Sequence, residues 1–189
     1  MKPVDVSEIK NLAEYELERN HWRPRIMALK ERRRIRVGGH LTFLFENHDT
    51  VRYQIQEMLR IERIAKPEEV AHEVDTYNEL IPGPNELSAS LLIEYETPEE
   101  RQVHLRELLG LENHLWLVVD GLPPAKAKFD ERQISTDRIS SVQYVKFPLT
   151  AEQAGRFPRG ARIVVDHPRY QAERVLTPGE LAELSSDLA

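Results

Sequence analysis

The chain has 189 residues, of which 40% are hydrophobic and 31% charged, and its formal net charge is −6 at pH 7. This length suits a single domain over residues 1–189, and the composition is typical of an ordinary soluble protein. The longest apolar runs, such as residues 115–119, are too short to span a membrane, and the acidic N-terminus does not resemble a secretory signal, so we expect a cytoplasmic protein. Cysteine is absent, which excludes disulfides, thiol nucleophiles and iron–sulfur clusters held by this chain's own thiolates.

The N-terminal half predicts helices arranged around one β-hairpin. Ser7 is a candidate N-cap for a first helix, and Pro24 suits the first turn of a second. Gly38 and Gly39 separate two apolar runs, which is typical of a tight hairpin turn. Asn47 precedes the next helix as a capping residue. The expected elements are helices over residues 8–20 and 24–33, strands over 35–37 and 41–45, a helix over 51–64, and a helix opened by Pro67.

The C-terminal half predicts mostly short strands separated by turn residues. Helices and strands are grouped rather than alternating, so we expect an α+β fold with a mainly antiparallel sheet and helices concentrated in the N-terminal half. The stretch IPGPN at residues 81–85 is a rigid break, and a subdivision of the chain would fall near residues 81–86. The expected elements are strands over residues 87–95, 115–119, 125–129, 142–147, 163–165 and 172–176, and helices over 98–109, 150–157 and 177–184.

The segment 51–64, VRYQIQEMLRIERI, predicts an amphipathic helix with an exception in its apolar arc. At about 100° per residue, the apolar side chains share one face of the helix with Gln54 and Glu62. The opposite, solvated face carries basic residues such as Arg52 and Arg60. A helix that only packs against a core has no need of two polar residues there, so we expect function near them.

A carboxylate at Glu62 would cost several kcal/mol to bury unless it is paired, hydrogen-bonded or bound to a metal. One interpretation is a structural ion pair with Arg25 or Arg52. The other is a ligand-binding or acid–base group. That second interpretation predicts a candidate catalytic site formed by Gln54, Glu57, Glu62 and His167, the last of which lies in the turn-like sequence HPRY.

Two pairs of residues have the spacing of carboxylate–histidine metal ligands. Glu18 with His21, and Glu69 with His72, each place a carboxylate and an imidazole three residues apart on one helix face. In ferritin-like bundles such pairs, with further glutamates such as Glu57 or Glu62, hold two irons. Those bundles need four long helices, whereas much of this chain predicts strands, so these four residues are weak metal candidates.

The strongest local charge is a basic run at Lys30, Arg32, Arg33, Arg34 and Arg36. One interpretation is that these side chains lie in solvent and complement the negative end of a helix dipole. The alternative is a site for a phosphate or an acidic protein partner. The chain contains no GxxxxGK[ST], GxGxxG, HExxH or GxSxG motif, so the sequence identifies no cofactor.

Four stretches, HLTFLFEN, VRYQIQEMLRIERI, YNELIPGPNELSASLLIEY and VDHPRY, resemble the uncharacterised bacterial family catalogued as domain of unknown function 3501. The resemblance runs over nearly the whole chain. Members of this family look like companions of rubrerythrin-type di-iron proteins and iron–sulfur oxidoreductases, and are often encoded beside them. The resemblance therefore implies a role in redox chemistry by association, and it implies no site residues.

The leading hypothesis is a cytoplasmic, non-catalytic accessory protein that docks onto a rubrerythrin-like or iron–sulfur redox protein. Its contact surface would combine the polar side of helix 51–64 with the basic run, and the binding residues would be Arg33, Arg34, Arg36, Arg52 and Arg60. The competing hypothesis is an enzyme or metal-binding protein with a site around Glu62. An RNA- or DNA-binding role would rest on the basic run alone, and the net negative charge of the chain argues against it. A homodimer is expected only because homodimers are the commonest oligomers of soluble proteins.

Overall fold

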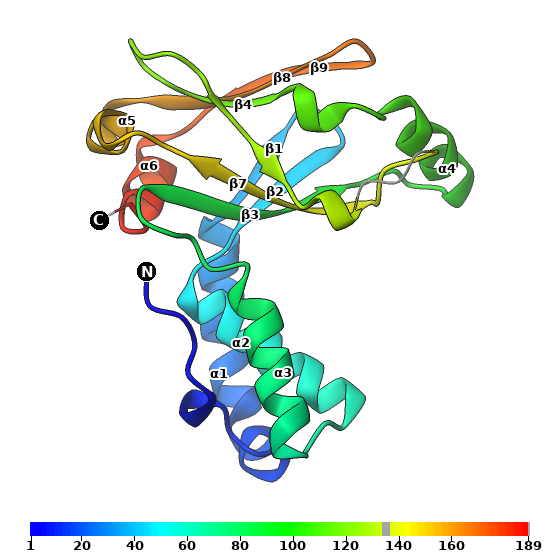
Figure 1. The fold of residues 1–189 in the computed structure, drawn as a ribbon, viewed down its shortest axis with the longest axis vertical. Coiled ribbons are helices and arrows are strands. Elements are labelled where there is room, and N and C mark those ends of the chain that lie inside the picture. Colours follow the sequence, from blue (N-terminus) through cyan, green and yellow to red (C-terminus); the bar gives the residue numbers. More distant parts are fainter. Residues whose placement is uncertain (134–136, 189) are drawn as a thin grey trace.

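The structure is a computed structural model, and it describes residues 1–133 and 137–188. Two β-sheets lie above a group of helices (Figure 1). The helices are α1 (Leu12–Arg32), α2 (His48–Glu62), α3 (Pro67–Asn78), α4 (Pro98–Glu107), α5 (Ala151–Arg156) and α6 (Pro178–Ser185). The strands are β1 (Arg34–Val37), β2 (Leu41–Phe45), β3 (Glu86–Ile93), β4 (Leu115–Val119), β5 (Ala125–Lys126), β6 (Lys128–Phe129), β7 (Val142–Pro148), β8 (Ala161–His167) and β9 (Tyr170–Val175). The expected α+β class is confirmed.

One sheet has five strands in the order β1-β2-β3-β7-β6, and the other has four in the order β5-β4-β8-β9; neighbouring strands are antiparallel. The strand expected over residues 125–129 divides between the sheets, because β5 pairs with β4 whereas β6 pairs with β7. Between them, Ala127 donates its N–H to the carbonyl of Leu115 at 2.9 Å. Elsewhere the hydroxyl of Tyr170 donates to the carbonyl of Val37 at 2.8 Å. Both contacts fasten one sheet to the other.

The main hydrophobic core lies between the two sheets. Alternate residues of β4 are fully buried, as the period of two along a strand requires. Phe43, Phe45 and Phe147 form its aromatic centre, with ring centroids 6.2–6.4 Å apart. Burying each such ring contributes roughly 1.5–3 kcal/mol. This core makes the paired sheets the rigid part of the molecule.

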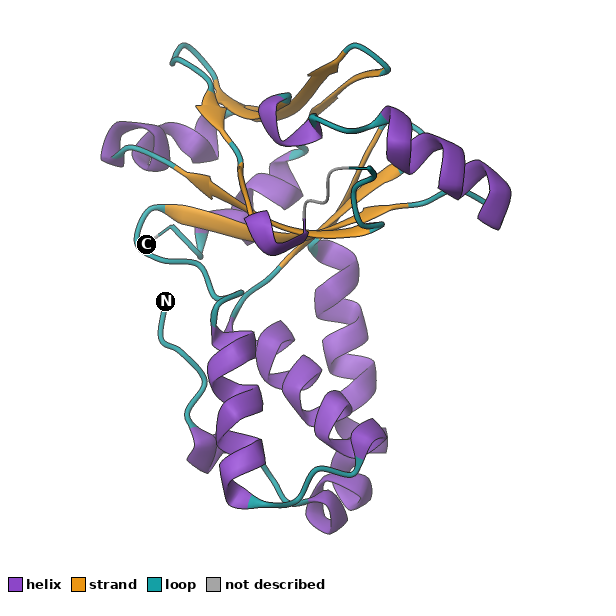
Figure 2. Cartoon of the chain, turned by 45° about the vertical axis from the view of Figure 1, so that its right-hand side comes forward, coloured by secondary structure: helices purple, strands orange, loops and turns teal. Residues whose placement is uncertain are grey.

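A helical lobe, formed by α1, α2 and α3, stands at the outer face of the five-stranded sheet (Figure 2). It has its own small core, in which Val51, Ile55 and Leu59 of α2 meet Val74 of α3. Helices α2 and α3 are inserted between β2 and β3, so residues 81–86 lead from the lobe back into the sheet. The hairpin β1–β2 pairs with β3 and is part of the same sheet.

Helix α1 corrects the expectation of two separate N-terminal helices. It runs without interruption over 21 residues with Pro24 inside it, and its N-cap is Asn11 rather than Ser7. Proline removes one helical hydrogen bond to the carbonyl four residues earlier, here that of Asn20. Pro24 and Asn20 are both exposed, so water can bond the freed carbonyl. None of the helices in the described part of the chain is long and apolar enough to cross a membrane.

Candidate functional site

The expectation that Glu62 is buried is wrong. Glu62 is exposed in the last turn of α2, and Ile61 beside it is 67% exposed. The polar residue that α2 does bury is Gln56, which bonds the backbone of Lys10 through its Oε1 (2.7 Å) and its Nε2 (3.1 Å). The buried arc is rotated because α2 packs against two helices, α1 and α3. Gln54, half-buried on the side toward α3, hydrogen-bonds the hydroxyl of Tyr77.

The face of α2 that we expected to bind a partner is covered by α1. Arg60 pairs with Glu16 at 2.7 Å, and Arg52 stacks over Trp22 with its guanidinium carbon 4.5 Å from the ring centroid. Glu57 is bonded by Arg19 at 2.7 and 2.9 Å and by the buried Tyr15 hydroxyl at 2.6 Å. The hydrogen bond from Arg19 holds the pKa of Glu57 below its usual value. These groups fasten α1 to α2, so the expected binding roles of Arg52 and Arg60 are not supported.

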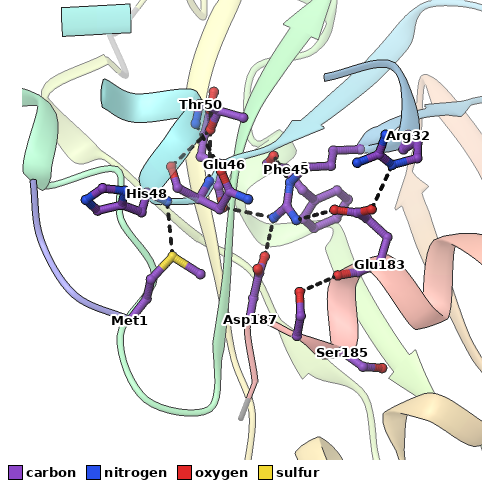
Figure 3. A network of polar contacts seen from close by, with 12 residues as sticks. Met1, Arg32, Phe45, Glu46, His48, Thr50, Glu183, Ser185 and Asp187 are labelled. Carbon is purple, nitrogen blue, oxygen red and sulfur yellow. Dashed lines mark hydrogen bonds and ion pairs between the residues drawn. The ribbon is translucent and has the colours of Figure 1, made fainter. Parts of the chain in front are cut away.

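Arg33 is the largest departure from expectation, because its side chain is 0% exposed. The guanidinium donates to the main-chain oxygens of Phe45 (2.9 Å) and Glu46 (3.2 Å). It also pairs with Glu183 of α6 at 3.2 Å and with the buried Asp187. Figure 3 shows these two carboxylates reaching from the C-terminal end of the chain toward Phe45 and Glu46. Arg33 is therefore a structural hub and not part of a docking surface.

Two other residues of the basic run, Arg34 and Arg36, lie in a small arginine surface at the edges of β1 and β9, whereas the exposed Arg32 pairs with Glu183 at 3.0 Å. A hollow there is lined by three arginines and two glutamates, a net charge of +1: Arg34, Arg36, Arg174, Glu31 and Glu180. Arg34 pairs with Glu31 at 3.7 Å, and Arg174 pairs with Glu180 at 2.9 Å. Arg36 is exposed and has no ion-pair partner within the described residues. Arg34 and Arg36 are thus at least partly accessible, and their binding of a partner stays a prediction.

The weak metal candidates do not come together. Glu18 pairs with Lys10 and Glu69 with Lys66, while His21 and His72 are exposed on different helices. Over residues 1–133 and 137–188, no three His, Asp or Glu side chains lie close enough to hold a metal ion.

His167 is 4% exposed in the second sheet, at the turn between β8 and β9. Its Nε2 donates to the carbonyl of Leu109 at 3.0 Å, and its Nδ1 accepts the N–H of Arg169 at 3.2 Å. Both ring nitrogens are therefore occupied by main-chain groups, one of Leu109 in the segment after α4 and one of Arg169 in the turn. The structure does not join His167 to Glu57 or Glu62, which lie in the helical lobe.

The strongest candidate site is a cleft between the helical lobe and the outer face of the five-stranded sheet, which we name the interlobe cleft. Its outer part has a volume of about 580 Å³, within the range of small-molecule sites. One wall is α3 with Tyr77 and the turn after it with Leu80, and the other is the sheet, with Ser88, Tyr144 and Lys146. In the β6–β7 pair, Lys128 stands directly opposite Lys146. Lys146 is paired with a glutamate of β3, whereas Lys128 is exposed and has no ion-pair partner among the described residues.

The inner part of the interlobe cleft, about 190 Å³, shares Tyr77, Leu80 and Tyr144 with the outer part. Lys30 and Glu46 line it, together with Gln54. Burial lowers the pKa of Lys30, while the carboxylate of Glu46 acts in the opposite direction. Burial also raises the pKa of the Tyr144 hydroxyl, which makes no hydrogen bond in the described part of the chain. The cleft thus combines aromatic walls with a few convergent polar groups.

Comparison with known proteins places this fold in a family. A family described as "protein of unknown function (DUF3501)" matches residues 3–188. The chain belongs to this family. A crystal structure of a novel protein of unknown function from Burkholderia pseudomallei K96243 is similar to the DUF3501 chain described here, with 32% identity, a TM-score of 0.93 and coverage of 100% of both chains. A comparison with curated proteins finds no match.

The sequence pointed to two lining residues of the cleft in this DUF3501 protein, Gln54 and Lys30 of the basic run, but missed Glu46 and Tyr144. Glu46 follows the strand LTFLF, in which all five residues are buried. A charged residue between such a strand and the N-cap Asn47 could have indicated a buried carboxylate. Tyr144 gave none, because its contact with the helical lobe joins elements far apart in the chain.

Proposed function

We propose that this DUF3501 protein is a non-catalytic accessory protein that binds a small organic molecule in the interlobe cleft. The observation that carries the proposal is the cleft itself. Its Tyr77, Leu80 and Tyr144 belong to the hydrophobic cluster of the helical lobe, and its Phe129 packs against the main core. Binding sites of this kind are concave and mostly apolar, with a few convergent polar groups and shifted pKa values. The Tyr144 hydroxyl and the Lys30 ammonium group, which have no hydrogen-bond or ion-pair partner within residues 1–133 and 137–188, fit that description.

The test is native mass spectrometry of protein purified under mild conditions. We expect a fraction of the protein to carry a non-covalent small molecule. Thr76 is exposed and lines the cleft, so Thr76→Trp should block the site and remove the bound mass. Asp75→Trp is the matched control, because Asp75 is exposed on the same helix and does not line the cleft. The proposal fails if no small molecule is bound and if a mixture of cell metabolites does not raise the melting temperature.

A second candidate function is docking onto a redox protein through the arginine surface. Arg36 favours it, because this side chain is exposed and has no ion-pair partner in the described part of the chain. The resemblance to companions of rubrerythrin-type and iron–sulfur proteins motivates the choice of partner. Basic surface groups mainly speed association with an acidic partner and make it sensitive to salt.

The test of docking is a binding measurement with a rubrerythrin-type protein and with an iron–sulfur oxidoreductase. Reversing charge at Arg34 and Arg36 to Glu should weaken binding and reduce its dependence on salt. Arg159→Glu is the control, because Arg159 is exposed and does not line that hollow. If the wild-type protein, the Arg34 and Arg36 charge-reversal variant and the Arg159→Glu control bind equally well, the arginine surface is not part of an interface with these partners.

A further inference from the structure

The inner end of the interlobe cleft holds two opposite charges that lack counter-ions within the described residues. The ammonium group of Lys30 makes no ion pair or hydrogen bond there, and it lies 5.4 Å from the centroid of the Tyr53 ring. Glu46 is only 6% exposed, and its carboxylate accepts two hydroxyl bonds, from Ser90 at 2.7 Å and from Thr50 at 2.5 Å. Hydroxyl donors satisfy part of the hydrogen-bonding capacity of a carboxylate and none of its charge.

The nearest arginine does not neutralise Glu46. The guanidinium of Arg33 bonds the main-chain oxygen of Glu46, and its charge is met by Glu183 and Asp187. Lys30 and Glu46 line the same hollow of about 190 Å³ but are not within ion-pair distance of each other. A buried charge without a counter-ion is costly, and the cost is relieved by any molecule that brings the missing partner. The missing partners here are one cation and one anion, both within the same hollow.

Building on the proposed function, we propose that the interlobe cleft binds a free α-amino acid. Its ammonium group pairs with the carboxylate of Glu46, in the hollow that the Tyr144 hydroxyl also lines. Its carboxylate pairs with the ammonium group of Lys30. An α-amino acid carries both charges on one carbon, so one small head group supplies both missing counter-ions inside the hollow.

The outer part of the cleft selects the amino acid by its side chain. Its apolar lining comes mainly from Tyr77, Leu80, Phe129 and Tyr144. Aromatic and apolar walls gain most from burying a large apolar or aromatic side chain. The ligand is therefore an amino acid such as phenylalanine, tryptophan or leucine, bound with its charged head inward.

Isothermal titration calorimetry of the full-length protein with each of the twenty proteinogenic amino acids tests the proposal, because it reports binding directly. We expect binding of at least one with a large apolar side chain. If that ligand is phenylalanine, 3-phenylpropanoate lacks its ammonium group and 2-phenylethylamine lacks its carboxylate, and each should bind at least about tenfold more weakly, as expected for losing one charged hydrogen-bonded pair. Lys30→Met and Glu46→Gln should weaken binding likewise, whereas Lys66→Met, at an exposed lysine of the N-cap of α3, should not.

Results of three kinds would overturn the proposal. If the analogues that lack one charge bind as tightly as the amino acid, the cleft does not recognise the ammonium and carboxylate groups of the ligand together. If Glu46→Gln proves unstable, the analogue series on the wild-type protein still decides. Binding of none of the twenty amino acids, with a molecule of another class found by native mass spectrometry, would refute this inference and leave the proposed function standing. Absence of any bound molecule would refute both.

Discussion

Replacing Arg33 by methionine is expected to remove a large share of the stability of the fold. The substitution keeps most of the volume of the side chain and deletes a guanidinium that is 0% exposed. Two carbonyl oxygens, of Phe45 and Glu46, lose their side-chain donors. The carboxylate of Asp187, whose side chain is 2% exposed, loses its partner. Removing one partner of a buried ion pair typically costs about 3–5 kcal/mol, against a total stability of about 5–15 kcal/mol for a domain.

The pH dependence of this loss follows from the carboxyl that remains. Burial already raises the pKa of Asp187 above its usual value, although Arg33 acts in the opposite direction. Without Arg33 the pKa rises further, so folding of the variant favours the protonated acid. A raised pKa contributes stability that is present below the unfolded value of 3.8 and is lost as the pH rises through the folded value. The variant should therefore be closest to wild type in acid and furthest from it at neutral pH.

Urea denaturation followed by circular dichroism measures the free energy of unfolding of each variant. The double variant Arg33→Met with Asp187→Leu should recover much of the loss, because replacing a whole buried pair by apolar groups is often close to neutral. Arg34→Met is the matched control: its side chain is 31% exposed and its pair with Glu31 spans 3.7 Å, so it should cost less than about 1 kcal/mol. An Arg33→Met protein within about 1 kcal/mol of wild type, or a double variant no more stable than the single one, would refute this reasoning.

Three further predictions use the same denaturation assay. Glu57→Gln should cost about 1–3 kcal/mol at pH 7, and the gap should close as the pH falls through the lowered pKa of Glu57, since a lowered pKa gives stability that acid removes; a gap independent of pH would contradict this. Gly38→Ala should cost about 1–3 kcal/mol, because Gly38 has a φ of +66° and a Cβ there would collide with the Tyr170 hydroxyl, whereas Gly39→Ala, with nothing within 4 Å, should be nearly neutral. Ser88→Val should stabilise the fold by about 0.5–2 kcal/mol by filling part of the interlobe cleft, and a loss of stability would show that the cleft is not open space.

Local signals in the sequence predicted most elements. Residues 115–119 form β4 as expected, and Pro67 stands at the first position of α3. Asn47 caps α2 in a reciprocal pair of bonds with Thr50. These features depend on residues a few positions apart, so periodicity and capping chemistry suffice. The exception is Pro24, whose local preference is overridden by the contact of α1 with α2.

The burial of Arg33 depended on partners that no local pattern shows. Glu183 and Asp187 lie 150 and 154 positions further along the chain. One signal was present, however: Arg33, Ile35 and Val37 are all buried, while Arg34 and Arg36 between them are not. The period of two of strand β1 therefore extends one residue further back, into what looked like a uniform charge run. A charge run next to a strand should be tested for alternation before it is assigned to solvent.

The interlobe cleft is open because its sheet wall carries small polar side chains where packing alone favours large apolar ones. Ser88 is 2% exposed on β3, and Ser90 lies two residues further on the same face. Serine is small and gains little from burial, whereas valine at such a position packs well and favours a strand. The hydroxyl of Ser90 donates a hydrogen bond to the carboxylate of Glu46, which explains a serine at that position. Ser88 has no side-chain hydrogen bond in the described part of the chain, and we attribute it to the space that a ligand needs.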